Sequence, residues 1–294
     1  MRRIVTVSWF RKKKVRKILT KILIYTVIVA GAIVFMVPLA WVVTTSLKEA
    51  RDALNYPPEW IPHALKWSNY SNAMKVGPWG LYFLNSLTIT SCAVIGQILS
   101  GSLVAFAFAR LYARDRNFLF IVLLATLMVP FQVTLIPLYT IFVKLGWVNT
   151  FKPLIVPFWF GGSAFYIFLM RQYFLTIPLE MDDAARIDGC NTFQIYYKII
   201  LPLSKPLLFA VAVFSFVANW NSFLGPLIYL DDTEKFTVTL GLLSFRAIGG
   251  AAVDFVDWPM VMAASLVVLS PCLLIFFLCQ KIFLRGIVIT GIKG

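Results

Sequence analysis

The sequence predicts an all-α integral membrane protein with six transmembrane helices, and three observations support this fold class. Of the 294 residues, 60% are hydrophobic and only 14% are charged, whereas about a quarter are charged in a typical soluble domain. The mean hydropathy is +0.82. The apolar residues are gathered in long uncharged runs, each close to the ~20 residues that a helix needs to cross roughly 30 Å of hydrocarbon.

Six uncharged runs are the expected spans. They lie at 22–43, 83–109, 118–143, 153–170, 206–230 and 259–280. Pro130 and Pro137 interrupt the third run, and we expect them to kink the helix without splitting it, because two separate halves would be too short to cross. This organisation gives a basic N-terminal segment at 1–21, a six-helix domain at 22–283 and a tail at 284–294.

The distribution of Lys and Arg predicts that both termini are cytoplasmic. With the N-terminus inside, nineteen of the 27 basic residues fall in cytoplasmic segments, and the other eight are balanced by eight acidic residues. The net charge of +14 is then carried on one side of the membrane, as the positive-inside rule requires. A basic chain can also bind nucleic acid, but the basic cluster at 11–17 adjoins a span, which favours a role in topology and lipid contact.

The six runs contain no Asp, Glu, Lys, Arg or His. Ion-coupled carriers usually keep such groups at membrane depth, although sodium-coupled carriers can use backbone oxygens instead. The chain also lacks the G-x-x-x-x-G-K-[ST] loop that binds ATP phosphates. We expect no cofactor on this chain and, because His63 has no ligand cluster around it, no metal site. Uphill transport would need energy from another polypeptide.

The loop at 177–206, between the fourth and fifth runs, is the most informative segment. A short helix is expected over 179–188, because Glu180, Asp182 and Asp183 favour its N-terminal end and Gly189 is a natural stop. The small side chains of Ala184 and Ala185 would let another protein approach the backbone closely. The alternative is a self-packed amphipathic hairpin on the lipid headgroups.

A second helix is expected in the same loop. Asn191 or Thr192 can cap it, and Gln194 follows Asn191 at the spacing of a capping box. We expect Pro202 to end this helix and Pro206 to begin the next span.

The spacing within the 177–206 loop resembles the signature of the membrane subunits of bacterial ABC importers. That signature is Glu-Ala-Ala, three residues, Gly, nine residues, Ile, one residue and Leu-Pro. The matching residues are Asp183, Ala184, Ala185, Gly189, Ile199, Leu201 and Pro202. Every spacing is kept, and Asp183 in place of Glu keeps the carboxylate but shortens its reach by one methylene.

Further motifs resemble the carbohydrate branch of this family, the maltose-permease type. They are Thr-Ser-Leu-Lys at 45–48, Phe-Leu-Asn-Ser at 83–86, Met-Val-Pro at 128–130, Ala-Arg-Ile-Asp-Gly at 185–189 and Asn-Trp-Asn at 219–221. The resemblance implies a type I importer fold in the bacterial inner membrane. It also implies a second homologous permease subunit, two cytoplasmic ATPase subunits that hold ATP and magnesium, and an extracytoplasmic solute-binding protein, which the outer loops at 44–82 and 231–258 would contact. In this type the tail, here 285–294, also reaches between the ATPase subunits.

Each ATPase subunit would receive one such loop, so that closure of the ATPase pair turns the spans from inward-open to outward-open. The residues expected to make this contact are Asp183, Ala184, Ala185, Arg186, Asp188 and Gly189. Neutral amides and aromatic rings within the spans suit an uncharged polyol. The candidate pathway residues are Asn219, Trp220, Asn221, Asn85 and Gln132. The alternative is that these polar groups bond neighbouring helices.

Other functions stay open at this point. An ABC importer for a peptide or a phosphate ester would be expected to show charged pocket residues. A secondary carrier would need coupling groups in unwound backbone. An intramembrane enzyme would need a nucleophile or metal cluster at span depth, and the sequence shows none.

Overall fold

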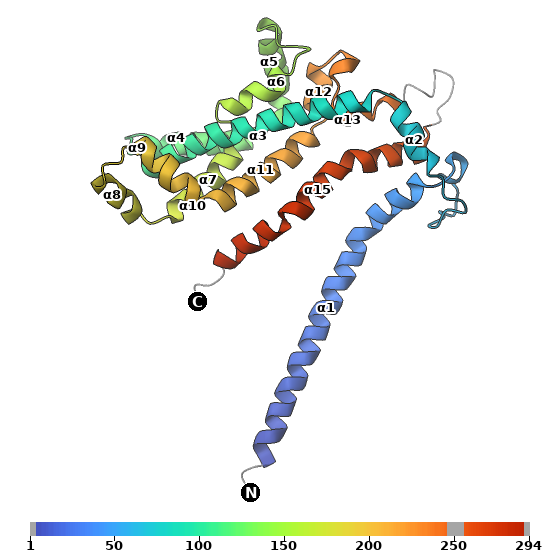
Figure 1. Cartoon of the computed structure of the whole chain (residues 1–294), viewed down its shortest axis with the longest axis horizontal. Helices are drawn as coiled ribbons and strands as arrows, with labels where there is room; N and C mark the ends of the chain where they lie inside the picture. Colours follow the sequence, from blue (N-terminus) through green and yellow to red (C-terminus); the bar gives the residue numbers. More distant parts are fainter. Residues whose placement is uncertain (1–3, 246–255, 291–294) are drawn as a thin grey trace. The chain divides into compact units, whose positions relative to one another are not determined.

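A computed structural model describes residues 4–245 and 256–290, and every regular element in these ranges is helical (Figure 1). Parts of the expected outer loop at 246–255 and of the expected tail at 291–294 lie outside the described residues. The chain divides into two compact units, which are described separately. One comprises Met1–Ala73 with Asp254–Leu266, and the other comprises Met74–Val253 with Val267–Gly294.

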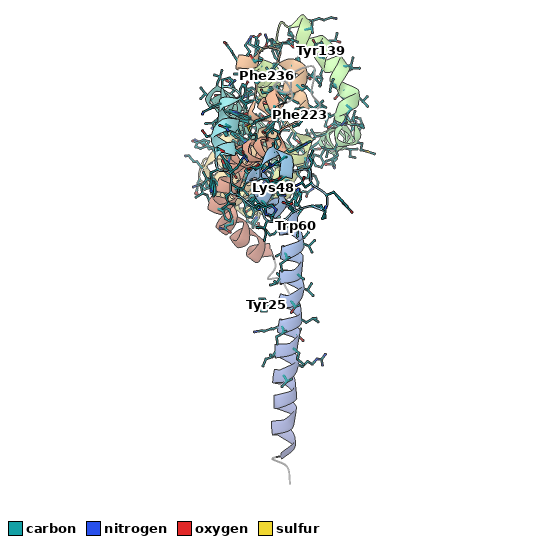
Figure 2. All side chains as sticks on the ribbon, turned by 90° about the vertical axis from the view of Figure 1, so that its right-hand side faces the viewer. Tyr25, Lys48, Trp60, Tyr139, Phe223 and Phe236 are labelled. Carbon is teal, nitrogen blue, oxygen red and sulfur yellow. The ribbon has the colours of Figure 1, made fainter. Side chains whose placement is uncertain are left out.

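The first unit is dominated by one long helix. Helix α1 (Ile4–Ser46) runs without a break across the expected boundary at residue 21. Its side chains stand out into the surroundings, as Figure 2 shows for Tyr25, which is 65% exposed. An apolar helix surface of this kind requires lipid or another chain around it.

The segment after α1 folds back on the end of that helix. Lys48 is buried and its ammonium lies 4.1 Å from the centre of the Trp41 ring. The Lys48 Nζ also donates a hydrogen bond to the Glu59 carbonyl. The Asn69 amide donates to the carbonyls of Ser46 and Lys48. The lysine ammonium is therefore held by one main-chain acceptor, with a ring face at close range, and its backbone carbonyl is held by Asn69.

The second unit is built around α3 (Trp79–Arg110), which packs against α7 (Ala164–Thr176) and α11 (Lys205–Trp220). Small residues let the neighbours approach it closely. A Cβ atom on Gly96 would lie 2.5 Å from the Trp159 ring. Helix α3 is thus the central element of this unit.

The expected third span is broken, so the prediction of a kinked but continuous helix is wrong. Helix α4 (Arg116–Ala125) and turn η2 (Thr126–Met128) are followed by α5 (Phe131–Lys144), and the two parts are bent by 99°. Val129 is extended, with φ −83° and ψ 115°. The ring of Pro130 disfavours a helical residue before it, which ends the first part. Pro137 lies inside α5 without ending it.

The other expected spans are helical, with different ends, but the fifth is long enough to cross a membrane only together with Thr192–Leu203, from which it is bent by 77°. The fourth is made of α6 (Lys152–Ile155), η3 (Val156–Trp159) and α7. The fifth ends at Trp220, and α12 (Leu224–Tyr229) is separate. Helix α15 (Trp258–Thr290) continues beyond residue 280. The described residues contain four helices that are long and apolar enough to cross a membrane, or six when each of two bent pairs counts as one span.

Candidate functional site: a helical hairpin at one end of α3

The first half of the 177–206 loop forms the predicted short helix. Helix α8 (Glu180–Ile187) begins after Leu179 and carries its three carboxylates in the first turn, where the helix dipole favours negative charge. Gly189 follows the helix with φ +81°, a left-handed conformation that favours glycine. Both the helix and its glycine stop are confirmed.

The second half forms the predicted second helix, and Asn191 is its cap. The Gln194 backbone N–H donates to Asn191 Oδ1 at 2.8 Å, and the Asn191 N–H donates to Gln194 Oε1 at 2.8 Å. These two bonds make the capping box at the start of α9 (Thr192–Ile195).

Pro202 does not end this helix, contrary to the prediction. The chain passes through a π-helical turn, η4 (Tyr196–Ile200), into α10 (Leu201–Leu203), which contains Pro202. The Leu201 N–H donates to the Tyr196 carbonyl five residues back. The wider π turn shifts the bonding pattern ahead of a residue that has no N–H to donate. The helix ends at Ser204, which leads directly into α11.

Helix α8 has a buried side and an exposed side. Asp182 and Ala185 are buried within the chain, and Ala185 belongs to the apolar core of this unit. The exposed residues of α8 and of the turn after it are Glu180, Met181, Asp183, Ala184, Arg186, Ile187, Asp188 and Gly189. Five of the six residues predicted for the ATPase contact are therefore accessible, and Ala185 is not. Of the two alanines, Ala184 alone leaves room for a partner to approach the backbone, because Ala185 packs inward.

Sequence reasoning missed Ile187 as a site residue. Its side chain is 87% exposed although it is a large apolar group. Its neighbours Asp183, Arg186 and Asp188 are charged and exposed. An isoleucine on the charged side of a short helix outside the apolar runs is the signal that could have identified it.

A buried ion pair attaches α8 to the last residue of α3. The Nε of Arg110 lies 3.2 Å from Asp182 Oδ2, and the two side chains are 3% and 5% exposed. The Arg110 Nη2 also donates to the Ile177 carbonyl at 2.7 Å. Burial raises the pKa of the Asp182 carboxyl, and the positive charges of Arg110 and Arg186 oppose this rise. Neither Arg110 nor Asp182 was predicted as a functional residue.

The two halves of the 177–206 loop form a helical hairpin, and a second polar contact attaches its second half to α3. The hydroxyls of Ser102 and Tyr196 are 2.7 Å apart and buried. The Tyr196 ring also lies against Phe106, with ring centroids 5.2 Å apart. The hairpin is therefore held at two points along the last part of α3, and Figure 1 shows it at the end of that helix opposite to α12 and α13.

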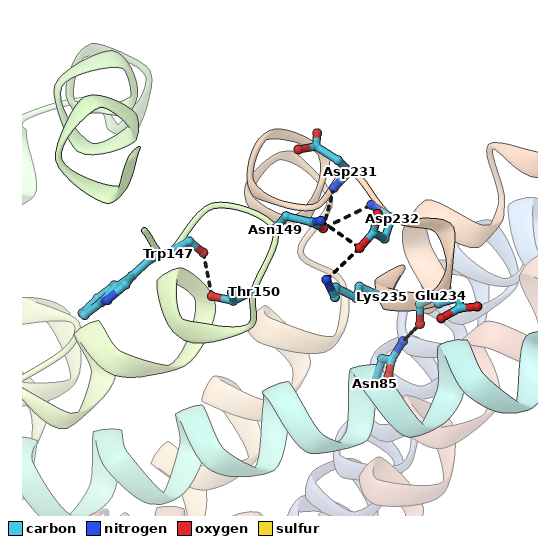
Figure 3. Close-up of polar contacts among 8 residues, drawn as sticks. All are labelled: Asn85, Trp147, Asn149, Thr150, Asp231, Asp232, Glu234 and Lys235. Atoms are coloured by element: carbon cyan, nitrogen blue, oxygen red, sulfur yellow. Dashed lines mark hydrogen bonds and ion pairs between the residues drawn. The ribbon is translucent and has the colours of Figure 1, made fainter. Parts of the chain in front are cut away.

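The opposite end of α3 carries a network of acidic and amide groups (Figure 3). Asn149 Oδ1 accepts from the backbone N–H groups of Asp231 and Asp232 at 3.2 and 3.1 Å. The Lys235 ammonium donates to Asp232 Oδ2 at 2.7 Å. The bonds from Lys235 and Asn149 lower the pKa of Asp232. The loop between α12 and α13 (Val238–Gly241) is fixed by these contacts.

The five candidate pathway residues do not come together. Asn85 is buried and its amide donates to the carbonyls of Glu234 and Phe236 at 2.7 and 3.0 Å (Figure 3). Trp220 is buried and donates from Nε1 to the Val268 carbonyl at 3.0 Å. Trp220 follows the alternative in which polar groups bond neighbouring helices, whereas Asn85 bonds the loop before α13. Asn221 and Gln132 are exposed.

Among these candidates, Asn219 lines a cavity with a volume of about 440 Å³. The cavity is bounded by α3, α5, α6, η3, α11 and α12, and its lining is largely aromatic and aliphatic. Its polar groups are neutral, namely Ser86, Thr90, Asn219, Ser222 and Thr237, with the phenol of Tyr229. Among the described residues no group of His, Cys, Asp and Glu is arranged to hold a metal ion.

The fold and the hairpin define a class, a polytopic helical membrane protein that carries a charged helical hairpin outside its apolar helices. The family of binding-protein-dependent transport system inner membrane components matches residues 97–288, and the chain belongs to this family. These are inner-membrane permeases of ABC importers, so the expected family and location are confirmed.

Individual relatives agree with this family. The chain is 32% identical to the probable ABC transporter permease protein YurM of Bacillus subtilis, over 87% of this chain and 83% of the relative. It is 36% identical to the arabinooligosaccharides transport system permease protein AraQ of Halalkalibacterium halodurans, over 75% of this chain and 76% of the relative. It is 31% identical to the sn-glycerol-3-phosphate transport system permease protein UgpE of Pectobacterium atrosepticum, over 90% of this chain and 94% of the relative.

A solved structure has the same fold. It is a chain from the crystal structure of a bacterial ABC transporter involved in the import of the acidic polysaccharide alginate. The TM-score is 0.74 at 21% identity, over 92% of this chain and 97% of that chain. The predicted fold class, an all-α permease fold, is confirmed.

Proposed function

We propose that the chain forms half of the translocation pathway of an ATP-driven importer for an uncharged sugar and works by alternating access. The other half is a second homologous permease subunit. Two cytoplasmic ATPase subunits hold ATP and magnesium, and an extracytoplasmic solute-binding protein delivers the sugar. The observation that carries the proposal is the hairpin at 177–206, which is anchored to α3 on one side and exposed on the other.

The exposed side of α8 has the anatomy of a protein contact. Ile187 provides an apolar centre, and Asp183, Arg186 and Asp188 surround it with charge. Interfaces usually combine an apolar anchor that fills a pocket with a polar rim that sets the register. The exposed glycine at 189 adds a place where a partner can approach the backbone.

The charges at the two ends of α3 support the proposed orientation. Arg110, Arg171 and Arg186 are located at the end that carries the hairpin. Asp231 and Asp232 lie at the other end, with Lys235 paired to Asp232. Because basic residues collect on the cytoplasmic side, the hairpin faces the ATPase subunits and the acidic loop faces the binding protein.

The cavity supports an uncharged substrate. It is lined by hydroxyl groups, one amide and aromatic rings, and it has no charged side chain in its lining. Such a lining can hydrogen-bond a sugar and stack on its apolar face. A phosphate ester is the second candidate, because one relative is named for sn-glycerol-3-phosphate. A phosphate would be expected to bring Arg or Lys into the lining.

The substrate is tested by calorimetry on the purified cognate binding protein. Titration with arabinooligosaccharides is expected to give saturable binding, and titration with sn-glycerol-3-phosphate is expected to give none. The reverse result would contradict the proposed sugar substrate and favour the phosphate ester.

Ile187→Ala is expected to weaken the contact with the ATPase subunit. Loss of a buried apolar anchor typically costs about 2 kcal/mol, which is roughly a thirtyfold loss of affinity. The measurement is the dissociation constant of the purified permease pair for the ATPase subunit. Ile61→Ala is the matched control, because Ile61 is 82% exposed but lies in the segment after α1. Equal affinities of the two variants would contradict the docking role of α8.

A further inference from the structure

The pair formed by Arg110 and Asp182 joins two elements with different roles. Arg110 is the last residue of α3, and Asp182 is in the first turn of α8. The same arginine donates to the Ile177 carbonyl, the point where the chain enters the hairpin. One side chain therefore holds both the entrance to the hairpin and its first helix.

The pair is poorly explained as a device for stability. Both side chains are almost fully buried, and charges that leave water lose much of what their attraction gains. In addition, Arg110 Nε and Asp182 Oδ1 are buried without a hydrogen-bond partner. Buried polar atoms are normally satisfied, so an incomplete pair at this place calls for another explanation.

Helix α3 connects this pair to the cavity. Its first half provides Ser86 and Thr90 to the cavity lining, and its last residue holds the hairpin. A helix rises 1.5 Å per residue, so the distance along α3 from Thr90 to Arg110 is about 30 Å. A movement of the hairpin reaches the cavity through α3 only if the junction at Arg110 does not yield.

We propose that Arg110 and Asp182 are positioning residues that hold α8 and α3 as one rigid body, so that displacement of the hairpin is transmitted to the cavity. This inference rests on the proposed function, because it assumes that a nucleotide-driven partner moves the hairpin. The contact between Ser102 and Tyr196 holds the second half of the hairpin, whereas α8 is held by the ion pair and by the buried side chain of Ala185.

The test measures whether the two helices move together. Spin labels are placed at Glu180 on α8 and at Leu87 on α3, which are both exposed, after the four native cysteines are replaced. Pulsed electron resonance then gives the distance distribution in the complex with both ATPase subunits, without nucleotide and with MgATP and vanadate. For the native pair we expect one narrow distribution that is the same in both states.

Asp182→Asn keeps the shape of the side chain but removes its charge. With MgATP and vanadate we expect the distribution to become at least twice as wide, and without nucleotide to change little. The exchanged pair Arg110→Asp with Asp182→Arg is expected to restore the narrow distribution. A narrow distribution for Asp182→Asn in both states would overturn the proposal.

An apolar pair separates positioning from stability. Arg110→Met with Asp182→Leu removes both buried charges, and such replacements are often neutral or stabilising. We expect an unchanged or higher melting temperature but a wide distribution with MgATP and vanadate. A narrow distribution here would overturn the proposal, because packing alone would then hold α8. This double variant also replaces Asp182→Asn in the test if that single variant does not fold because Arg110 is left unpaired.

The pH dependence gives an independent readout. The charged groups around the Asp182 carboxyl are Arg110 on α3 and Asp183 and Arg186 on α8. Burial raises the pKa of the Asp182 carboxyl, so this carboxyl binds a proton more readily in the folded chain than in the unfolded chain. Its contribution to the stability of the fold therefore increases as the pH falls from the raised pKa toward the ordinary aspartate value. Protonation also breaks the ion pair. The distance distribution of the native chain should therefore widen in that pH window, while the distribution of Asp182→Asn should not change with pH. A constant native distribution would overturn the proposal.

Failure of this inference differs from failure of the proposed function. If the native chain neither co-purifies with an ATPase subunit nor responds to MgATP and vanadate, the proposed function fails. If it does both and the variants behave like the native pair, only the role of Arg110 and Asp182 fails.

Discussion

Gly189→Arg is expected to leave the chain folded and inserted but to lower ATP-driven uptake at least tenfold. The glycine is exposed, and a Cβ atom there would meet nothing within 4 Å. Its φ of +81° makes a side chain locally unfavourable, by about 1–2 kcal/mol. The larger effect comes from a long charged side chain at the proposed contact with the ATPase subunit. Uptake of the sugar by proteoliposomes, divided by ATP hydrolysed, measures this loss of coupling.

Gly146→Arg is the matched control for this variant. Gly146 also has a positive φ, +64°, and a Cβ atom there would also meet nothing within 4 Å. It follows α5 and is not part of the 177–206 loop. Backbone strain is therefore similar in the two variants, and only Gly189→Arg should reduce uptake. Normal coupling in Gly189→Arg would contradict the docking role of the hairpin.

Gly162→Ala is expected to destabilise the fold by about 2–4 kcal/mol, the sum of an unfavourable backbone conformation and overpacking. The glycine has φ +61°, and an added Cβ atom would lie 2.1 Å from Gln97 Oε1. Gln97 cannot easily move, because it is fully buried. Its Oε1 accepts from the Ser163 N–H at 2.7 Å, and its Nε2 donates to the Gly161 carbonyl at 3.2 Å. Both bonds would be strained or lost.

The melting temperature of the purified protein in detergent checks this prediction. Gly80→Ala is the control, because Gly80 is helical and exposed and a Cβ atom there would meet nothing within 4 Å. Alanine is favoured over glycine within a helix by up to about 1 kcal/mol, so this variant should melt at the same temperature or slightly higher. Equal melting temperatures for Gly162→Ala and the native protein would mean that Gln97 does not constrain the turn.

Local chemistry allowed several features to be predicted from the sequence. The helix over 179–188 follows from carboxylates at its start and a glycine at its end, and the capping box follows from the spacing of Asn191 and Gln194. The uncharged runs indicated the apolar helices, because a helix must hide its backbone from lipid within a limited length. The family could also be predicted, since its signature is a short pattern of residue types.

Only the tertiary structure decided which side chains of these elements face inward. Asp182 and Asp183 are adjacent carboxylates, yet one is buried against Arg110 and the other is exposed. Their difference depends on a partner 72 positions away in the sequence. The burial of Asn85 likewise depends on distant partners, because the carbonyls that accept from its amide are on the loop before α13.

The sequence by itself determined the membrane class, the apolar helices and the hairpin with its caps, because these depend on neighbours a few residues apart. The tertiary structure decided the break at Val129, the passage of a helix through Pro202, the burial of Ala185 and the ion pair that holds the hairpin to α3. The last two depend on what another segment of the chain offers in space, and the presence of a proline does not decide by itself whether a helix breaks before it or continues through it. A local pattern carries no information about that.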